Sequence, residues 1–134
     1  MRSTVLASLA AACALTTGAL AQDPITPQEF LLRLEGRTAW FSNDFGHVGV
    51  EHFHGDGTST WLRADGTCSR GIITTPDTRV CFRYEDQPGI EWCWHTFDDD
   101  GTLTVLSADA FAEWQRIVRL SRSRLSCAPT GPGV

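Results

Sequence analysis

Two cysteines placed symmetrically about a turn constrain the fold of this chain more than any other feature. Cys81 and Cys93 lie in two runs rich in apolar residues, 79–84 and 90–97, on either side of the Gln-Pro-Gly turn at 87–89. Short alternating runs around such a turn are typical of a β-hairpin. We therefore predict two antiparallel strands that bring the two sulfur atoms together.

The side-chain pattern specifies the register of this hairpin. When Cys81 lies opposite Cys93, Arg83 lies opposite Glu91, and opposite charges across two strands favour their pairing. The other face of the hairpin then carries only apolar and aromatic side chains, namely Val80, Phe82, Tyr84, Ile90, Trp92 and Trp94. A shift by one residue would turn this whole set to the opposite face, so the register is strongly specified.

The hairpin register also selects a disulfide pattern. Four cysteines remain once a predicted leader is removed, and an even number is typical of an oxidising compartment. If Cys81 pairs with Cys93, then Cys68 is left to pair with Cys127. Zinc binding by the four cysteines is the alternative, but they lack the C-x-x-C spacing of common structural sites.

The N-terminus has the three parts of a secretory signal peptide. Residues 1–21 contain Arg2, an apolar run over 5–15 and a small-x-small cleavage site that ends at Ala21. No later stretch approaches the length of a membrane-spanning helix. We expect a periplasmic or secreted protein cleaved after Ala21, and the alternative is a lipoprotein processed at Cys13.

Cleavage leaves a chain of the size of one domain. We assign residues 22–127 to a single domain and expect 128–134, which is rich in Pro and Gly, to be a disordered tail. After cleavage 10 Arg stand against 16 acidic residues, a net charge of −6. This balance argues against nucleic acid as a partner. We expect a monomer with no membrane span and no cofactor.

The pattern after residue 36 predicts a mainly β fold. Turn sequences recur every 9 to 13 residues, which leaves no room for crossover helices, so the strands must run antiparallel as a meander. We predict strands near 37–43, 47–54, 58–63, 67–74, 79–84, 90–97 and 102–106. Closure protects the edge strands, so we predict a small up-and-down barrel of seven or eight strands.

Two segments beside the meander have their own signals. Thr26-Pro-Gln-Glu29 is a capping box before an apolar stripe, and Gly36 suits a helix stop, so we predict a short N-terminal helix. For 107–127 we predict a short helix over 107–114 followed by a closing strand. Whether 115–122 is strand or helix stays open at this point.

Several motifs along the chain resemble those of one protein group. They are Phe53-x-x-Asp56-Gly57-Thr58, Asp65-Gly66-Thr67-Cys68, Val80-Cys81-Phe82-x-Tyr84, Cys93-Trp94 and Leu125-Ser126-Cys127. In this order they are similar to small exported proteobacterial proteins classed as a domain of unknown function. The resemblance covers about residues 30 to 127 and implies a lipocalin-like β-barrel that is located in the periplasm. It assigns no catalytic residue.

One histidine-rich segment invites a chemical interpretation. His52 and His54 lie two residues apart on a predicted strand, so both rings point from one face and could hold a metal ion. The segment also resembles the start of the cupin metal motif, but the glutamate expected after it is replaced by Thr58 and Ser59, which disfavours a cupin. The simpler interpretation is that the two histidine rings lie at the end of a hairpin and are partly solvated. Neither face of the strand 47–54 is cleanly apolar, so the inward face stays undetermined.

The function expected from these patterns is binding. The chain has no G-x-S-x-G elbow, phosphate loop or H-E-x-x-H motif, so we expect no enzyme and assign no catalytic residue. We predict that the barrel binds a small apolar ligand or a protein partner, with candidate ligand-binding residues Phe82, Tyr84, Trp92 and Trp94. The alternatives are a metal-binding protein that uses His52 and His54, and an inhibitor of a secreted protease.

Overall fold

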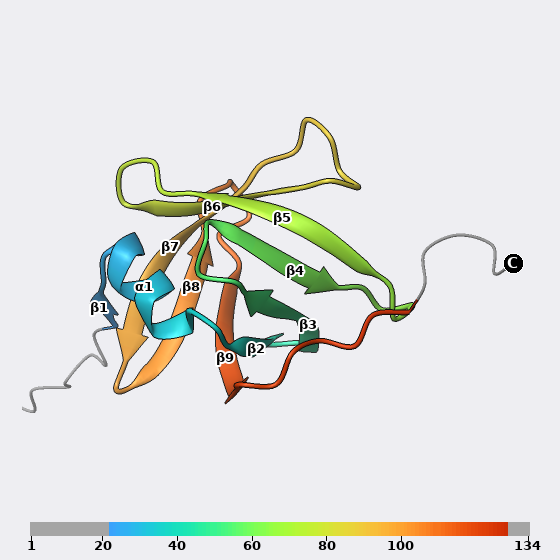
Figure 1. Cartoon of the computed structure of the whole chain (residues 1–134). Coiled ribbons are helices and arrows are strands. Elements are labelled where there is room, and N and C mark those ends of the chain that lie inside the picture. The colour runs from blue at the N-terminus through green and yellow to red at the C-terminus, as the bar shows by residue number, and fades with distance from the viewer. Residues whose placement is uncertain (1–21, 129–134) are drawn as a thin grey trace, which may run out of the picture.

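Eight antiparallel strands close into a barrel in the computed structural model, which describes residues 22–128 (Figure 1). The strands are β2 (Thr38–Asn43), β3 (Gly46–Phe53), β4 (Thr58–Leu62), β5 (Cys68–Thr74), β6 (Arg79–Tyr84), β7 (Trp92–Asp99), β8 (Thr102–Ser107) and β9 (Trp114–Ser121). Each strand pairs with the next along the chain, and β9 pairs with β2 to complete the ring. The prediction of an up-and-down barrel is confirmed. A two-residue strand, β1 (Asp23–Pro24), pairs with β7 and was not predicted.

The predicted hairpin register is confirmed. Cys81 lies opposite Cys93, with Val80 opposite Trp94 and Phe82 opposite Trp92. Both predicted disulfides are present, Cys81–Cys93 with a Cα–Cα distance of 4.0 Å and Cys68–Cys127 with one of 5.5 Å.

Two features flank this register. Arg83 Nε lies 2.7 Å from Glu91 Oε2, as the charge pattern predicts. Ile90, in contrast, does not join the inner face, because its backbone N–H donates to Gln87 O across a tight turn and β7 begins only at Trp92. Its side chain is exposed.

The predicted helix over 107–114 is wrong. After β8 the carboxylate of Asp109 accepts hydrogen bonds from Phe111 N and Ser107 Oγ, and this local network forms a turn. Asp favours such turns because its side chain competes with helical backbone bonding. The strand predicted after it is confirmed as β9, which decides that 115–121 is extended.

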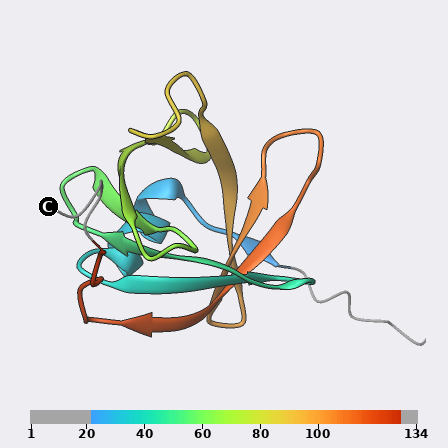
Figure 2. The ribbon, with the colours of Figure 1, turned by 90° about the vertical axis from the view of Figure 1, so that its right-hand side faces the viewer.

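The predicted N-terminal helix, α1 (Pro27–Leu34), is confirmed and closes one end of the barrel. Thr26 Oγ1 accepts a hydrogen bond from Glu29 N at 3.1 Å, as an N-cap does. Phe30 and Leu34 are fully buried in the core of the barrel. Burial of two such side chains contributes on the order of 3 to 6 kcal/mol. Arg33 connects the helix to the end of β7, because its Nη1 lies 2.6 Å from Asp98 Oδ2. Figure 2 shows α1 within the outline of the ring of strands.

The two faces of β3 have different surroundings. The inward face carries Gly49, Glu51 and Phe53, whereas His52 points outward, where Thr38 Oγ1 lies 2.8 Å from its Nδ1. The C-terminal segment runs over this outer face, since Thr38 Oγ1 also donates to Ser123 O.

The same segment is fixed at its end by the Cys68–Cys127 disulfide and by a hydrogen bond from Ala128 N to Gly66 O, at 2.8 Å. The rest of the tail predicted over 128–134 lies outside the described residues, as does the predicted signal peptide.

Candidate ligand cavity

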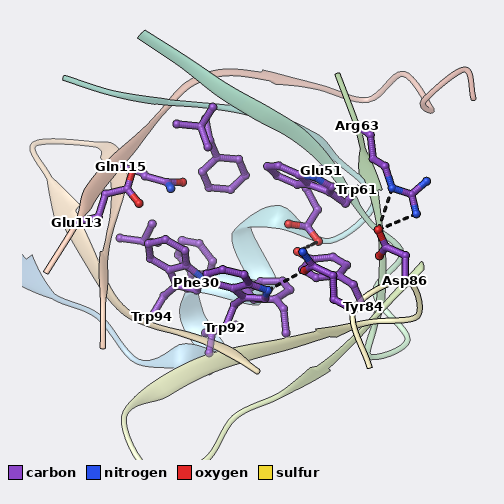
Figure 3. Close-up of a pocket in the computed structure, with 16 residues that line it drawn as sticks. Phe30, Glu51, Trp61, Arg63, Tyr84, Asp86, Trp92, Trp94, Glu113 and Gln115 are labelled. Atoms are coloured by element: carbon purple, nitrogen blue, oxygen red, sulfur yellow. Dashed lines mark hydrogen bonds and ion pairs between the residues drawn. The ribbon is translucent and has the colours of Figure 1, made fainter. Parts of the chain in front are cut away.

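The barrel encloses a cavity of about 400 Å³. Its floor is Phe30 of α1, and its mouth lies at the opposite end, where the β2–β3, β4–β5, β6–β7 and β8–β9 turns meet because consecutive strands are antiparallel. Figure 3 looks into this cavity. The lining residues are Phe30, Phe41, Val48, Glu51, Trp61, Arg63, Val80, Phe82, Tyr84, Asp86, Gln87, Trp92, Trp94, Val105, Glu113 and Gln115.

Two glycines in the strands let aromatic rings lie against the wall. A Cβ atom at Gly49 would stand 2.1 Å from the ring of Trp61, and one at Gly71 would stand 3.0 Å from the ring of Tyr84. Both distances are shorter than van der Waals contact, so only glycine lets these rings lie so close to the backbone. The rings therefore line the interior and leave space at its centre.

All four residues predicted to bind a ligand line this cavity. Phe82, Tyr84, Trp92 and Trp94 project inward from the β6–β7 hairpin. The rings of Phe82 and Tyr84 are stacked, with centroids 6.1 Å apart and planes 5° apart. Trp92 lies at the mouth, where its Nε1 donates to Gln87 Oε1 at 2.9 Å. The hairpin thus forms a continuous aromatic wall from the interior to the mouth.

One carboxyl group lies inside this apolar wall. Glu51 is 3% exposed, and the Tyr84 hydroxyl donates to its Oε1 at 2.8 Å. Burial raises the pKa of Glu51 from 4.5 to about 7, against the opposing effect of the Ser59 and Tyr84 hydroxyls. Burial and the neighbouring Glu51 also raise the pKa of Tyr84 well above its ordinary value. Figure 3 shows the Glu51 carboxyl pointing into the cavity.

Sequence reasoning missed Glu51 as a site residue. Its signal was present in the pairing of β3 with β4, which places Glu51, Phe53 and Trp61 on one face. Gly49 lies on that face too, and a glycine in a strand marks close approach of a large side chain. Weighing the two large aromatic residues and this glycine would have indicated the inward face.

Charged residues at the mouth are already paired. Arg63 binds Asp86 through a contact of 2.8 Å from its NH2 group, and Ser69 Oγ also donates to Asp86. The hydrogen bond from Ser69 and, to a smaller extent, the contact with Arg63 lower the pKa of Asp86. Glu113 accepts a hydrogen bond from Asn43 Nδ2 at 2.6 Å. Glu51 is therefore the one acid among the lining residues without a cationic or amide partner.

The two histidines singled out by the sequence lie on the outer surface of the barrel. Their ring centroids are 4.8 Å apart, and each ring hydrogen-bonds a threonine, His52 to Thr38 and His54 to Thr60 at 2.7 Å. Burial lowers the pKa of His52. Within residues 22–128, one group of three possible metal ligands has its ligand atoms within 4.8 Å of one another, namely Cys81, Glu91 and Cys93. The two sulfur atoms of this group are bonded to each other in a disulfide. Metal binding by the histidines stays a prediction.

The cavity combines three properties that suit reversible binding. Its wall is mostly aromatic and aliphatic, it holds one buried carboxyl at which a polar group can be oriented, and one end is open. Binding sites for small molecules commonly join an apolar lining to a few polar groups. Comparison of the chain with protein-family models, with curated protein sequences and with solved structures finds no match.

Proposed function

We propose that this protein is a non-catalytic binding protein that holds a small apolar molecule inside the barrel. The observation that carries the proposal is the cavity of about 400 Å³ between α1 and the open mouth. An eight-stranded barrel is just wide enough either to be filled by its own side chains or to hold one small ligand. Glycines at positions 49 and 71 place Trp61 and Tyr84 against the wall, which favours the second case.

Exposed apolar side chains at the open end support the same function. The turns there carry Phe45, Ile90 and Phe111, all of which are exposed, and Trp92 is 39% exposed at the mouth. An apolar molecule that approaches this end meets apolar surface before it reaches the interior. Contact with such surface removes both partners from water and lowers the free energy of the approach.

We also propose that the protein acts in the periplasm or outside the cell, as one of the exported proteins of unknown function that its motifs resemble. Two disulfides support this proposal, because disulfides persist in oxidising compartments. Within residues 22–128, no helix has the length and apolar character needed to cross a membrane.

A titration with a neutral apolar probe tests the binding proposal. We expect 1-octanol to bind the mature, disulfide-bonded protein saturably in calorimetry and to change its tryptophan emission, because Trp61, Trp92 and Trp94 line the cavity. The variant Val105→Trp adds volume inside the cavity and should weaken binding at least about tenfold. The matched control Val118→Trp places the same side chain at an exposed position of β9 and should bind as the parent does.

Circular dichroism and thiol titration establish that both variants fold with their disulfides intact. Absence of saturable binding in the parent protein would contradict the proposal. Equal binding by the Val105→Trp variant would place the probe outside the cavity and would contradict it as well.

A further inference from the structure

We propose that the natural ligand is an apolar amine whose ammonium group binds the carboxylate of Glu51, while its apolar part packs against the aromatic wall. This inference rests on the function proposed above and names the chemical class of the ligand. Three observations lead to it: the balance of charge inside the cavity, the hydrogen bonding of Glu51, and the aromatic surface around it.

The charge balance of the lining favours a cation. Among the lining residues the basic side chain is Arg63, and it is paired with Asp86 at the mouth. Glu51 lies deeper and has no positively charged neighbour among the described residues. A fatty acid or another carboxylate would bring a second negative charge beside it without a counter-ion. An ammonium group would supply the missing opposite charge.

The hydrogen bonding of Glu51 leaves room for a donor from the ligand. The Tyr84 hydroxyl donates to Oε1 at 2.8 Å, and the buried Ser59 hydroxyl lies close enough to lower the pKa of this carboxyl. These two hydroxyls leave acceptor positions of the carboxylate unused. An ionised carboxylate accepts up to about four hydrogen bonds, whereas an ammonium group has three donors and no acceptor. The two groups are therefore complementary.

Aromatic side chains surround the place that the ammonium group would occupy. The rings of Trp61 and Tyr84 lie with centroids 6.3 Å apart beside Glu51, and Trp92 and Trp94 form the adjacent wall (Figure 3). The faces of such rings attract cations through their quadrupoles. The same rings bury the apolar part of the ligand. An aliphatic or aromatic amine satisfies both requirements in one molecule.

The ionisation of Glu51 provides a separate signature. The pKa of its buried carboxyl is about 7, so at that pH part of the population is protonated. A bound ammonium group favours the carboxylate, so binding near pH 7 should release a fraction of a proton for each ligand bound. The other ionisable groups of the lining are Tyr84, beside it, and Arg63, Asp86 and Glu113 at the mouth. The pKa of Tyr84 is raised and that of Asp86 lowered, so neither changes charge near pH 7.

A set of probes with the same chain length tests the inference. We expect octylamine to bind the mature protein at pH 7.5 at least about tenfold more tightly than 1-octanol, and octanoate to bind most weakly, because charge-assisted hydrogen bonds are about twice as strong as neutral ones. Calorimetry in buffers of different ionisation enthalpy should detect proton release with octylamine alone.

Two variants assign the preference to one carboxyl. Glu51→Gln keeps the shape of the side chain but removes its charge, so it should weaken octylamine binding at least about tenfold and leave 1-octanol binding nearly unchanged. The control Glu91→Gln removes a carboxyl from the outer face of the β6–β7 hairpin, where it pairs with Arg83, and should keep the preference.

The outcomes separate this inference from the proposed function. Equal or tighter binding of 1-octanol or octanoate would overturn the inference and leave the apolar binding function standing. An amine preference that survives in Glu51→Gln would overturn it too. If none of the three probes binds, both proposals fail.

Discussion

Replacement of Glu51 by glutamine should change how the stability of the protein depends on pH. The folded protein holds this carboxyl in an apolar wall, with a pKa of about 7 against 4.5 for an unperturbed group. Between these two values the folded state keeps the proton and the unfolded state loses it. Stability that is fully present below pH 4.5 is therefore lost as the pH rises to about 7.

The size of the effect follows from the shift. Each pKa unit corresponds to 1.36 kcal/mol, so the shift from 4.5 to about 7 amounts to about 3 kcal/mol. The variant Glu51→Gln has no such proton to lose. Relative to the parent protein, its free energy of unfolding should rise by about 3 kcal/mol between pH 4.5 and pH 7.5.

Urea unfolding followed by tryptophan fluorescence at pH 4.5, 5.5, 6.5 and 7.5, with the disulfides intact, measures this difference. His52 acts in the opposite direction over part of the same range, because its lowered pKa makes stability rise with pH. It is present in both proteins and cancels in the comparison. A relative change below about 1 kcal/mol, or one of the opposite sign, would refute the burial of Glu51 in an apolar wall.

Two further predictions concern the barrel wall and the disulfides. Gly49→Ala should destabilise the protein by about 1 to 3 kcal/mol in urea unfolding, because its Cβ would stand 2.1 Å from the Trp61 ring. Adding Trp61→Phe should recover part of the loss, and an unchanged stability of Gly49→Ala would contradict the contact. Serine replacement of Cys68 and Cys127, 59 residues apart, should cost about 4 kcal/mol, and replacement of Cys81 and Cys93, 12 residues apart, about 3 kcal/mol, since a longer closed loop restricts the unfolded chain more. A larger loss from the second pair would contradict this entropic argument.

The β6–β7 hairpin could be predicted from the sequence because three independent signals agree on one register. The cysteines, the aromatic face and the Arg83–Glu91 pair each require the same alignment, and the structure has it. The antiparallel meander followed from turn spacing, since short connections force antiparallel neighbours, and closure followed from the need to protect the edge strands. Both disulfides then followed from the hairpin by elimination.

Polarity alone did not predict the inward face of β3, because burial there does not follow polarity. Glu51 is turned inward and His52 is covered on the outside by the C-terminal segment, so a polar residue is buried on each face. A segment far away in the sequence causes the second burial, and no local pattern contains it. The turn after β8 was misread for a related reason, since Asp109 forms side-chain hydrogen bonds that helix propensity does not include.

The proposed ligand lies inside the barrel, with its ammonium group beside Glu51. Nuclear Overhauser contacts between octylamine and the isotope-labelled protein test it most directly. We expect contacts from the alkyl chain to the indole protons of Trp61 and Trp94, and from the methylene next to nitrogen to the side chain of Glu51. Contacts confined to exposed residues such as Phe45 and Phe111, with none to the two indoles, would contradict it.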